Sequence, residues 1–189
     1  MTKNINWIIL NLVNLVDNLF LLEGIYMYSV GDVVIYSSHG LCSIEDICEQ
    51  TFSDITKTYY VLHPLNDSKL TIRTPIDNAK KQLRDIIKKD DAQKILHSFT
   101  SPGVEWIEQN THRMRYHIEI IKSGDRQKQA NLLNTLLRKK LEFLALEKKF
   151  PNQEEKLLQT LQESIFSEFS IALNKPSEEI YEDVLTKLQ

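Results

Sequence analysis

The sequence has few cysteines and no recognisable set of metal ligands. Its only cysteines are Cys42 and Cys48. Six residues apart on a regular strand, they would lie on the same face but ~20 Å from each other, too far for a disulfide. We therefore expect two reduced thiols, as is usual in the cytoplasm.

Catalytic motifs are also absent from the sequence. No serine, cysteine or histidine lies in a nucleophile motif, and no glycine-rich phosphate loop or zinc spacing occurs. We therefore expect no enzymatic activity, no metal, no cofactor and no small-molecule substrate.

The chain also lacks a long uninterrupted hydrophobic run. Residues 1–26 are apolar, but asparagine and aspartate interrupt them before a run of ~18 residues is reached. They also lack a small-x-small cleavage site. Three interpretations stay open: an interfacial amphipathic helix, a helix that packs on the body, or translated sequence upstream of a true start at Met27. A protein anchored to a membrane surface by this segment is one candidate function.

The chain has no strong net charge, because its formal charge is −3. Its charges are unevenly distributed, however. Residues 104–150 carry ten Lys/Arg against six Asp/Glu, whereas residues 151–189 carry three against eight and residues 27–77 carry three against seven. A basic middle segment can bind a polyanion even when the net charge of the whole chain does not favour such binding.

Short β-branched segments with turn signals between them follow Met27. We expect strands within 30–36, 41–52, 57–65 and 68–75, the last ended by Pro75. This density of short strands predicts a small SH3-like or Tudor-like β-barrel over residues 27–77.

Residues 78–189 carry no further strand signal and predict a compact all-α domain of about five helices. We expect short helices within 83–99, then helices within 101–125, 126–149, 150–173 and 174–188. Gly124 and Asp125 suit a C-cap and the next N-cap. The predicted core-facing residues are Val104, Ile107, Met114, Ile118 and Ile121, then Leu133, Leu137, Leu141 and Leu144, then Leu158, Leu161, Ile165 and Phe169. The fold class is therefore α+β, with a barrel followed by helices.

Both predicted domains resemble one bacterial family. The segments "YSVGDVVIYSSHGLCSIEDI", "YYVL" and "LTIRTP" resemble the RNA-polymerase-interacting module of CarD/CdnL transcription regulators, which the transcription-repair coupling factor shares. The segments "EWIEQNTHRMRYHIEIIKSGDRQKQANLLNTLLRKK" and "LQESIFSEFSIALNKPSEEIYEDVL" resemble the helical C-terminal domain of the Firmicutes members. The resemblance covers residues 28–188.

This resemblance implies a bacterial, cytoplasmic and monomeric regulator of transcription. The barrel would add its sheet to an edge of the RNA polymerase β subunit. The helical domain would contact upstream promoter DNA, where an aromatic wedge enters the minor groove and basic residues hold the backbone. The expected result is a stabilised open complex with little reading of sequence.

The resemblance also suggests the polymerase-binding residues. Arg73 matches the family's polymerase-contacting arginine, and Thr71 lies beside it on the same strand. A second arginine of some relatives falls on Gln50 here. Alternation along the strand assigns Leu70 and Ile72 to the barrel core and Arg73 to the outside.

Trp106 is the candidate wedge for DNA. Counted from Ser123–Gly124–Asp125, some relatives carry their tryptophan at the position of Asn110, one helical turn away. On a continuous helix Trp106, Arg113 and His117 would share an exposed stripe, which favours Arg113 as a phosphate contact. The candidate DNA-binding residues are Trp106, Arg113, His117, Lys122, Arg126 and Lys128.

Two alternatives stay open. Trp106 could instead pack against its own domain. The helical domain could bind another protein and not DNA, which would make the chain an adaptor on the polymerase. Arg115 is expected to pair with Glu108 or Glu119, and the run Arg138–Lys140 to form a solvated helix face.

Overall fold

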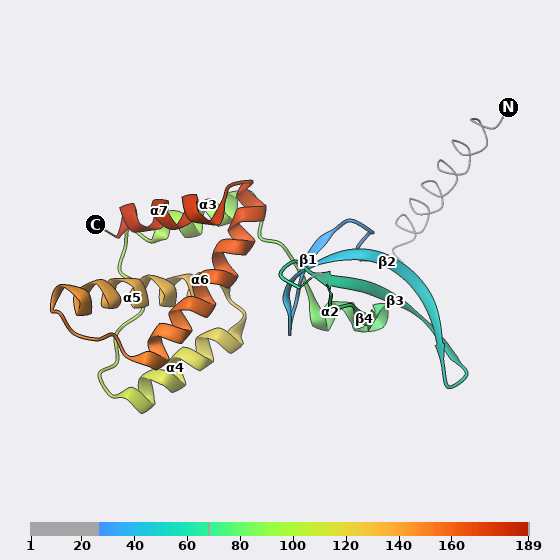
Figure 1. The fold of residues 1–189 in the computed structure, drawn as a ribbon, viewed down its shortest axis with the longest axis horizontal. Helices are drawn as coiled ribbons and strands as arrows, with labels where there is room; N and C mark the ends of the chain where they lie inside the picture. The colour runs from blue at the N-terminus through green and yellow to red at the C-terminus, as the bar shows by residue number, and fades with distance from the viewer. Residues whose placement is uncertain (1–26, 68, 189) are drawn as a thin grey trace. The chain divides into compact units, whose positions relative to one another are not determined.

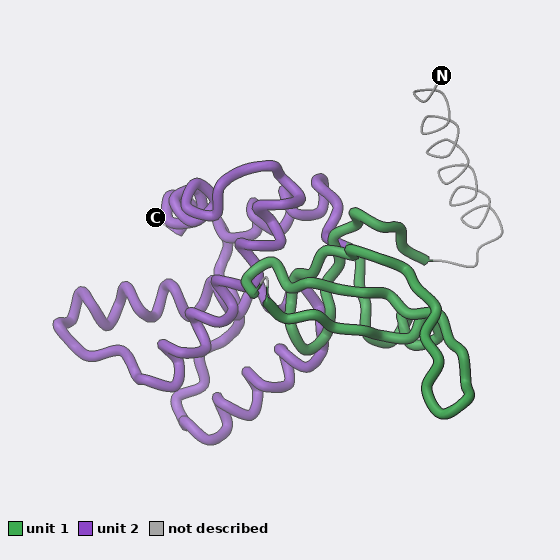
Figure 2. The backbone as a smooth tube through the Cα atoms, turned by 45° about the vertical axis from the view of Figure 1, so that its right-hand side comes forward, with its two compact units in different colours: residues 1–85 green, residues 86–189 purple. Residues whose placement is uncertain are grey.

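A computed structural model describes residues 27–67 and 69–188 of the chain. It divides into two compact units, residues 1–85 and 86–189 (Figure 2). The segment 1–26, with its three interpretations, lies outside the described residues.

The first unit is a five-stranded antiparallel sheet (Figure 1). Its strands are β1 (Val33–Tyr36), β2 (Gly40–Phe52), β3 (Ile55–Pro64), β4 (Ile72–Pro75) and β5 (Leu83–Asp85), in the order β4-β3-β2-β1-β5. A 3-10 turn (Ile76–Asn78) and the short helix α2 (Ala79–Gln82) connect β4 to β5. Within the described part of the chain β4 and β5 do not pair, so the curved sheet stays open. The Tudor-like α+β fold is confirmed.

One face of this sheet forms the core of the first unit. The core consists of Tyr28, Val34, Cys42, Ile44, Tyr60, Leu62, Ala79 and Leu83. The Tyr60 hydroxyl lies inside this core and accepts hydrogen bonds from the backbone amides of Met27 and Tyr28, at 3.0 and 3.1 Å. This contact fixes the chain where it enters the sheet.

The prediction that no strand follows Asp77 is wrong. Leu83–Asp85 pairs with β1 as an edge strand, and the Leu83 side chain is buried in the core of the sheet. A strand of three residues is too short to show a period-2 pattern, so it could not be recognised from periodicity. As a result, the first unit extends to residue 85 instead of ending at residue 77.

The second unit contains five helices in its described residues. They are α3 (Lys89–Ser98), α4 (Asn110–Ser123), α5 (Arg126–Ala145), α6 (Asn152–Leu173) and α7 (Ser177–Lys187). Gly124 ends α4 in the left-handed conformation, with φ 64°, and the Asp125 side chain accepts a hydrogen bond from the Lys128 amide. Both predicted caps are confirmed. Among the described residues, no helix is long and apolar enough to cross a membrane.

The core of the second unit matches part of the predicted pattern. All four residues predicted to face inward from α6 are buried, and so are Leu133 and Leu137 of α5. Leu141 and Leu144, however, are 46% and 71% exposed. They are exposed because only the first half of α5 is enclosed by the other helices, where Leu132 and Leu136 are also buried.

The prediction for α4 is wrong in two respects. The helix begins at Asn110, so Trp106 lies in the preceding loop and not on the helix. The buried residues of α4 are Arg113, His117 and Ile120, whereas Ile118 is 45% exposed. Of the predicted stripe, Val104 and Ile121 do pack against the core. The helix is nevertheless rotated relative to that stripe, because its buried face contains a paired charge.

Candidate functional sites

The face of the sheet opposite the core carries the predicted polymerase-binding residues. Directly opposed residues of antiparallel strands point to the same face. Arg73 lies opposite Val61, and Gln50 lies opposite Lys57, all at positions that alternate with core residues such as Tyr60. Arg73 and Gln50 therefore share this surface, which we call the outer face.

Thr71 extends the same row just before β4. Its hydroxyl lies 3.3 Å from Nε2 of His63 on β3. Arg73 is exposed, as predicted, and makes no side-chain hydrogen bond or ion pair with any residue that the structure describes. The structure thus brings Arg73, Thr71 and Gln50 to one face and leaves the Arg73 guanidinium available to a partner.

The outer face lies next to an available strand edge. Strand β4 is the last strand of the sheet and pairs on one side only, with β3. Unpaired backbone groups at such an edge can hydrogen-bond an added strand. The candidate polymerase site therefore combines a backbone edge with an exposed cation.

A β-bulge changes the expected position of the cysteines. The register of β2 against β3 shifts between Ile44 and Asp46, so one extra residue enters β2 there. Cys42 consequently points into the core, and Cys48 lies on the outer face opposite Tyr59. The prediction that both lie on one face assumed a regular strand and is wrong, although both thiols are free. Burial raises the pKa of the Cys42 thiol.

In the helical unit, Arg113 is buried, and its guanidinium group bonds to other groups of the same unit. Its side chain forms an ion pair with Glu154 of α6, with Nε and Nη2 at 2.9 and 2.6 Å from Glu154 Oε1. Nη1 donates to the carbonyl oxygens of Ile107 and Glu108, at 2.7 and 2.9 Å. The side chains of Arg113 and Glu154 are 7% and 1% exposed. Arg113 therefore joins the loop before α4 to the start of α6 and cannot reach a phosphate in this structure.

The loop before α4 is also held against α5. The Thr135 hydroxyl donates to the Val104 carbonyl at 2.7 Å. A Cβ at Gly103 would lie 2.2 Å from the Asn131 carbonyl oxygen, so only glycine allows this approach.

Trp106 lies in this loop and packs against the helical core. The Arg113 guanidinium carbon is 4.3 Å from the centroid of its ring, and Lys139 Nζ is 5.7 Å away. These are cation–π distances. In this structure Trp106 therefore packs against its own domain, which is the alternative to a DNA wedge. The expected exposed stripe of Trp106, Arg113 and His117 does not exist.

His117 is fully buried and is not a surface residue. Neither ring nitrogen has a hydrogen-bond partner among the described residues. Its ring centroid lies 6.4 Å from that of Trp106. Desolvation by burial, and secondarily the nearby Arg113 charge, lower the pKa of His117. The imidazole is therefore neutral at pH 7 and cannot act as a surface cation for DNA.

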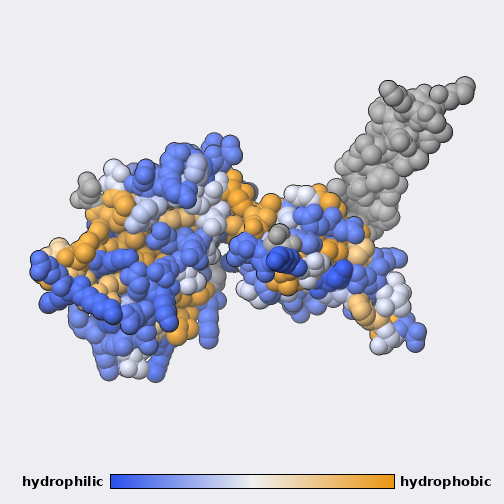
Figure 3. Space-filling model, in the orientation of Figure 1, coloured by the Kyte–Doolittle hydropathy of each residue, from blue (hydrophilic) through white to orange (hydrophobic). Residues whose placement is uncertain are grey.

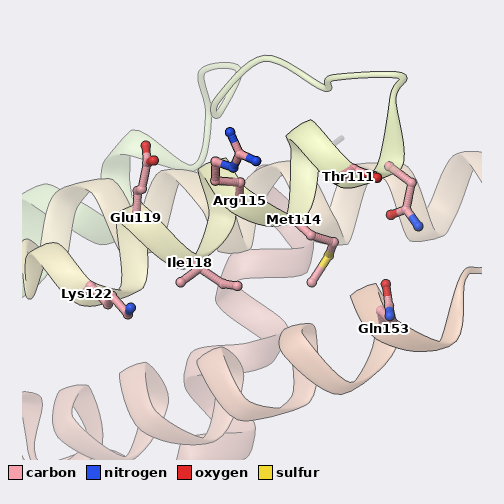
Figure 4. A pocket seen from close by; sticks show the side chains of 8 residues that line it. Thr111, Met114, Arg115, Ile118, Glu119, Lys122 and Gln153 are labelled. Carbon is pink, nitrogen blue, oxygen red and sulfur yellow. The ribbon is translucent and has the colours of Figure 1, made fainter.

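The exposed face of α4 carries the available cations of this region. An open groove of about 600 Å³ runs along it and is bounded by Gln153 at the start of α6 (Figure 4). Its lining comprises Asn110, Thr111, Met114, Arg115, Ile118, Glu119, Lys122 and Gln153. In the described part of the chain, Arg115 and Lys122 form no side-chain hydrogen bond or ion pair, so the expected pairing of Arg115 with Glu108 or Glu119 is wrong. Two cations therefore flank an exposed isoleucine.

The other predicted cations differ in their availability. Lys128 is exposed, and its backbone amide takes part in the Asp125 cap. Arg126 is partly buried, and its Nε lies 2.8 Å from Oε1 of Glu168, which also accepts from the Ile87 amide. Arg126 therefore anchors the chain at the start of the second unit.

The run Arg138–Lys140 is not a uniformly solvated face. Arg138 donates to the carbonyl oxygens of Phe99 and Leu188, at 2.8 and 2.9 Å, and so closes the helical unit internally. Lys139 and Lys140 instead pair with Glu142 and Glu155.

Comparison with known proteins identifies the class of protein. Residues 28–87 match the CarD-like/TRCF RID domain, and residues 94–185 match the CarD C-terminal domain. These two matches coincide with the sheet unit and the helical unit in the order found here. The chain therefore belongs to the CarD-like family of transcription regulators, whose domains imply interaction with RNA polymerase in general.

One curated relative is similar over most of its length. It is a protein of Bacillus subtilis (strain 168) named "Putative transcription factor YdeB". It is 26% identical over 146 residues, which span 77% of this chain and 92% of the relative. The similarity thus extends across both units and supports a role in transcription.

Proposed function

We propose that this protein binds the β subunit of RNA polymerase through its sheet and stabilises the promoter open complex through its helical unit. The observation that carries the proposal is that Arg73, Thr71 and Gln50 share the outer face and that Arg73 lies on the edge strand β4. An added strand would supply backbone hydrogen bonds, and Arg73 would supply a charge-assisted contact. The protein would act in the cytoplasm as a monomer.

The DNA contact in this proposal is made by the exposed face of α4 and not by its buried face. Arg115 and Lys122 lie along the groove, and Lys128 follows at the start of α5. Contacts of such cations with phosphates give affinity without reading sequence. Arg113 and Trp106 serve this surface indirectly, because they hold the loop and the first turn of α4 in place.

The polymerase part of the proposal is tested with Arg73→Glu. The full-length variant should lose binding to purified polymerase and should no longer lengthen the lifetime of the open complex. Reversing one exposed charge leaves the core of the sheet intact, so the melting temperature should not change. Unchanged polymerase binding would refute the assignment of the outer face.

The DNA part is tested by the salt dependence of binding to a forked promoter fragment. Arg115→Gln/Lys122→Gln should reduce the slope of log K against log salt by about 2, because each phosphate contact contributes about 0.9. Lys94→Gln/Lys175→Gln is the matched control, since it removes the same charge from residues already paired with Asp91 and Glu179. Equal slopes for the two double variants would exclude α4 as the DNA surface.

A second candidate function is favoured by the apolar part of the groove. Ile118 is 45% exposed, and Met114 lines the same groove. Exposed apolar side chains in a groove suit a protein partner better than a phosphate backbone. If the protein binds polymerase but no forked DNA at any salt concentration, the helical unit acts as an adaptor for another protein.

A further inference from the structure

The β2–β3 hairpin is much longer than the strands on either side of it. β2 and β3 pair along their whole length, from Cys42–Pro64 to Phe52–Ile55. In contrast, β1 pairs only with residues 40–43 of β2, and β4 pairs only with residues 59–62 of β3. The end of the hairpin is therefore a two-stranded ribbon without neighbouring strands in the described part of the chain (Figure 1).

Apolar side chains gather near the end of this ribbon. Phe52 and Ile55 lie directly opposite each other and are 58% and 60% exposed. The Tyr59 ring lies at 5.9 Å from the Phe52 ring in an edge-to-face arrangement. Figure 3 shows apolar atoms in this region of the surface. We call Phe52, Ile55 and Tyr59 the tip patch.

The turn fixes the direction of the tip patch. Ser53 and Asp54 have φ values of 49° and 63°, which fit a two-residue hairpin turn with both residues left-handed. This turn sets the register, so Phe52 and Ile55 must emerge on the same face. Polar residues would satisfy the turn equally well, and so the turn does not explain why an exposed phenylalanine and isoleucine flank it.

The tip patch lies on the outer face, together with the candidate polymerase-binding residues. Phe52 is two residues from Gln50, and Tyr59 lies opposite Pro75, two residues from Arg73. Side chains two residues apart on a strand share a face. The patch is therefore continuous with the surface that contains Arg73 and Gln50.

We propose that the tip patch docks onto an apolar surface of the RNA polymerase β subunit and is a main source of affinity in this chain. This inference rests on the proposed function. Arg73 gives the outer face an exposed charge, whose contacts with a partner weaken as the salt concentration rises. An adjoining aromatic and aliphatic cluster supplies binding energy of another kind, because buried aromatic anchors dominate many interfaces. Contact through the patch should persist at salt concentrations that weaken the Arg73 contact.

The test compares variants of the full-length protein for binding to purified RNA polymerase by biolayer interferometry. Phe52→Ser/Ile55→Ser should weaken binding by about 30-fold or more at both low and high salt, as expected for loss of an apolar anchor. Leu144→Ser is the matched control, because Leu144 is 71% exposed on α5, outside the sheet unit. Its affinity should equal that of the wild type.

Three outcomes separate the inference from the proposed function. If Arg73→Glu loses binding but the tip variant binds like the wild type, the tip patch is not part of the interface and this inference is wrong. If both variants bind like the wild type, the proposed polymerase site is wrong as well. If the wild type forms a dimer that only the tip variant disrupts, with polymerase binding unchanged, the patch joins two copies of the chain and this inference is again overturned. Melting curves of each variant check that the sheet remains folded.

Discussion

Replacing Glu154 by glutamine should strongly destabilise the helical unit. The Glu154 side chain is 1% exposed, and its partner Arg113 is 7% exposed. Glutamine preserves the shape of the side chain but leaves the Arg113 charge buried without a counter-charge. Loss of one partner of a buried pair costs about 3–5 kcal/mol. A domain of ~100 residues is stable by only about 5–15 kcal/mol, so this single change removes a large part of the total.

The assay for this prediction is thermal unfolding followed by circular dichroism. A loss of about 3 kcal/mol should lower the melting temperature of the helical unit by about 12 °C or more, at roughly 4–8 °C per kcal/mol. Glu155→Gln is the control on the neighbouring residue, since Glu155 pairs with Lys140 at the surface. An exposed pair contributes under about 1 kcal/mol.

A double-mutant cycle tests the physical reason for the effect. In an Arg113→Met background the buried cation is absent, so Glu154→Gln no longer leaves a charge without a partner. The loss of unfolding free energy caused by Glu154→Gln should therefore be smaller in that background than in the wild type, by more than about 1 kcal/mol. Equal melting temperatures for Glu154→Gln and Glu155→Gln, or strictly additive effects in the cycle, would refute the buried pair as the source of stability.

Two further predictions concern residues near this pair. The pKa of His117 is lowered in the folded state, so unfolding takes up a proton at acid pH. The free energy of unfolding should therefore fall as the pH drops below about 6.5, by at most about 1.4 kcal/mol per pH unit. His117→Phe should flatten this decline in urea unfolding measured between pH 5 and 8, and a parallel decline in both proteins would contradict it. Gly103→Ala should lower stability by about 1–3 kcal/mol, because its Cβ would lie 2.4 Å from the Thr135 hydroxyl; a melting temperature unchanged from wild type would show that the loop is not held against α5.

The sheet was largely predictable because its strands follow simple local rules. Four strands have β-branched or alternating segments, and the alternation correctly assigned Arg73 to the outside. The exceptions are local irregularities. The bulge after Ile44 reverses the direction of Cys48, and Leu83–Asp85 is too short to have a period. Both depend on pairing with other strands, which a single strand's sequence does not encode.

The helical unit was predictable in its number of helices and in its caps, but not in the orientation of α4. Periodicity identifies the buried face by its apolar residues, and α4 has Met114, Ile118 and Ile121 on one side. In the structure Arg113 and His117 are buried instead. A charged residue enters a core only with a partner, and Glu154 lies 41 positions away on another helix. No local pattern connects the two residues.

The buried pair therefore determines which surface the helical unit presents. With Arg113 turned inward toward Glu154, residues on the far side of α4 must turn outward, and Arg115, Ile118 and Lys122 become the lining of the groove. The same pair holds the carbonyl groups of the preceding loop, and Arg113 lies against the ring of Trp106. Trp106 therefore packs beneath the groove-lining face of α4 and helps to hold that helix in position. If the helical unit binds DNA as proposed, its contacts should come from the exposed residues of α4, and Arg113 should affect that binding only through the position of this helix.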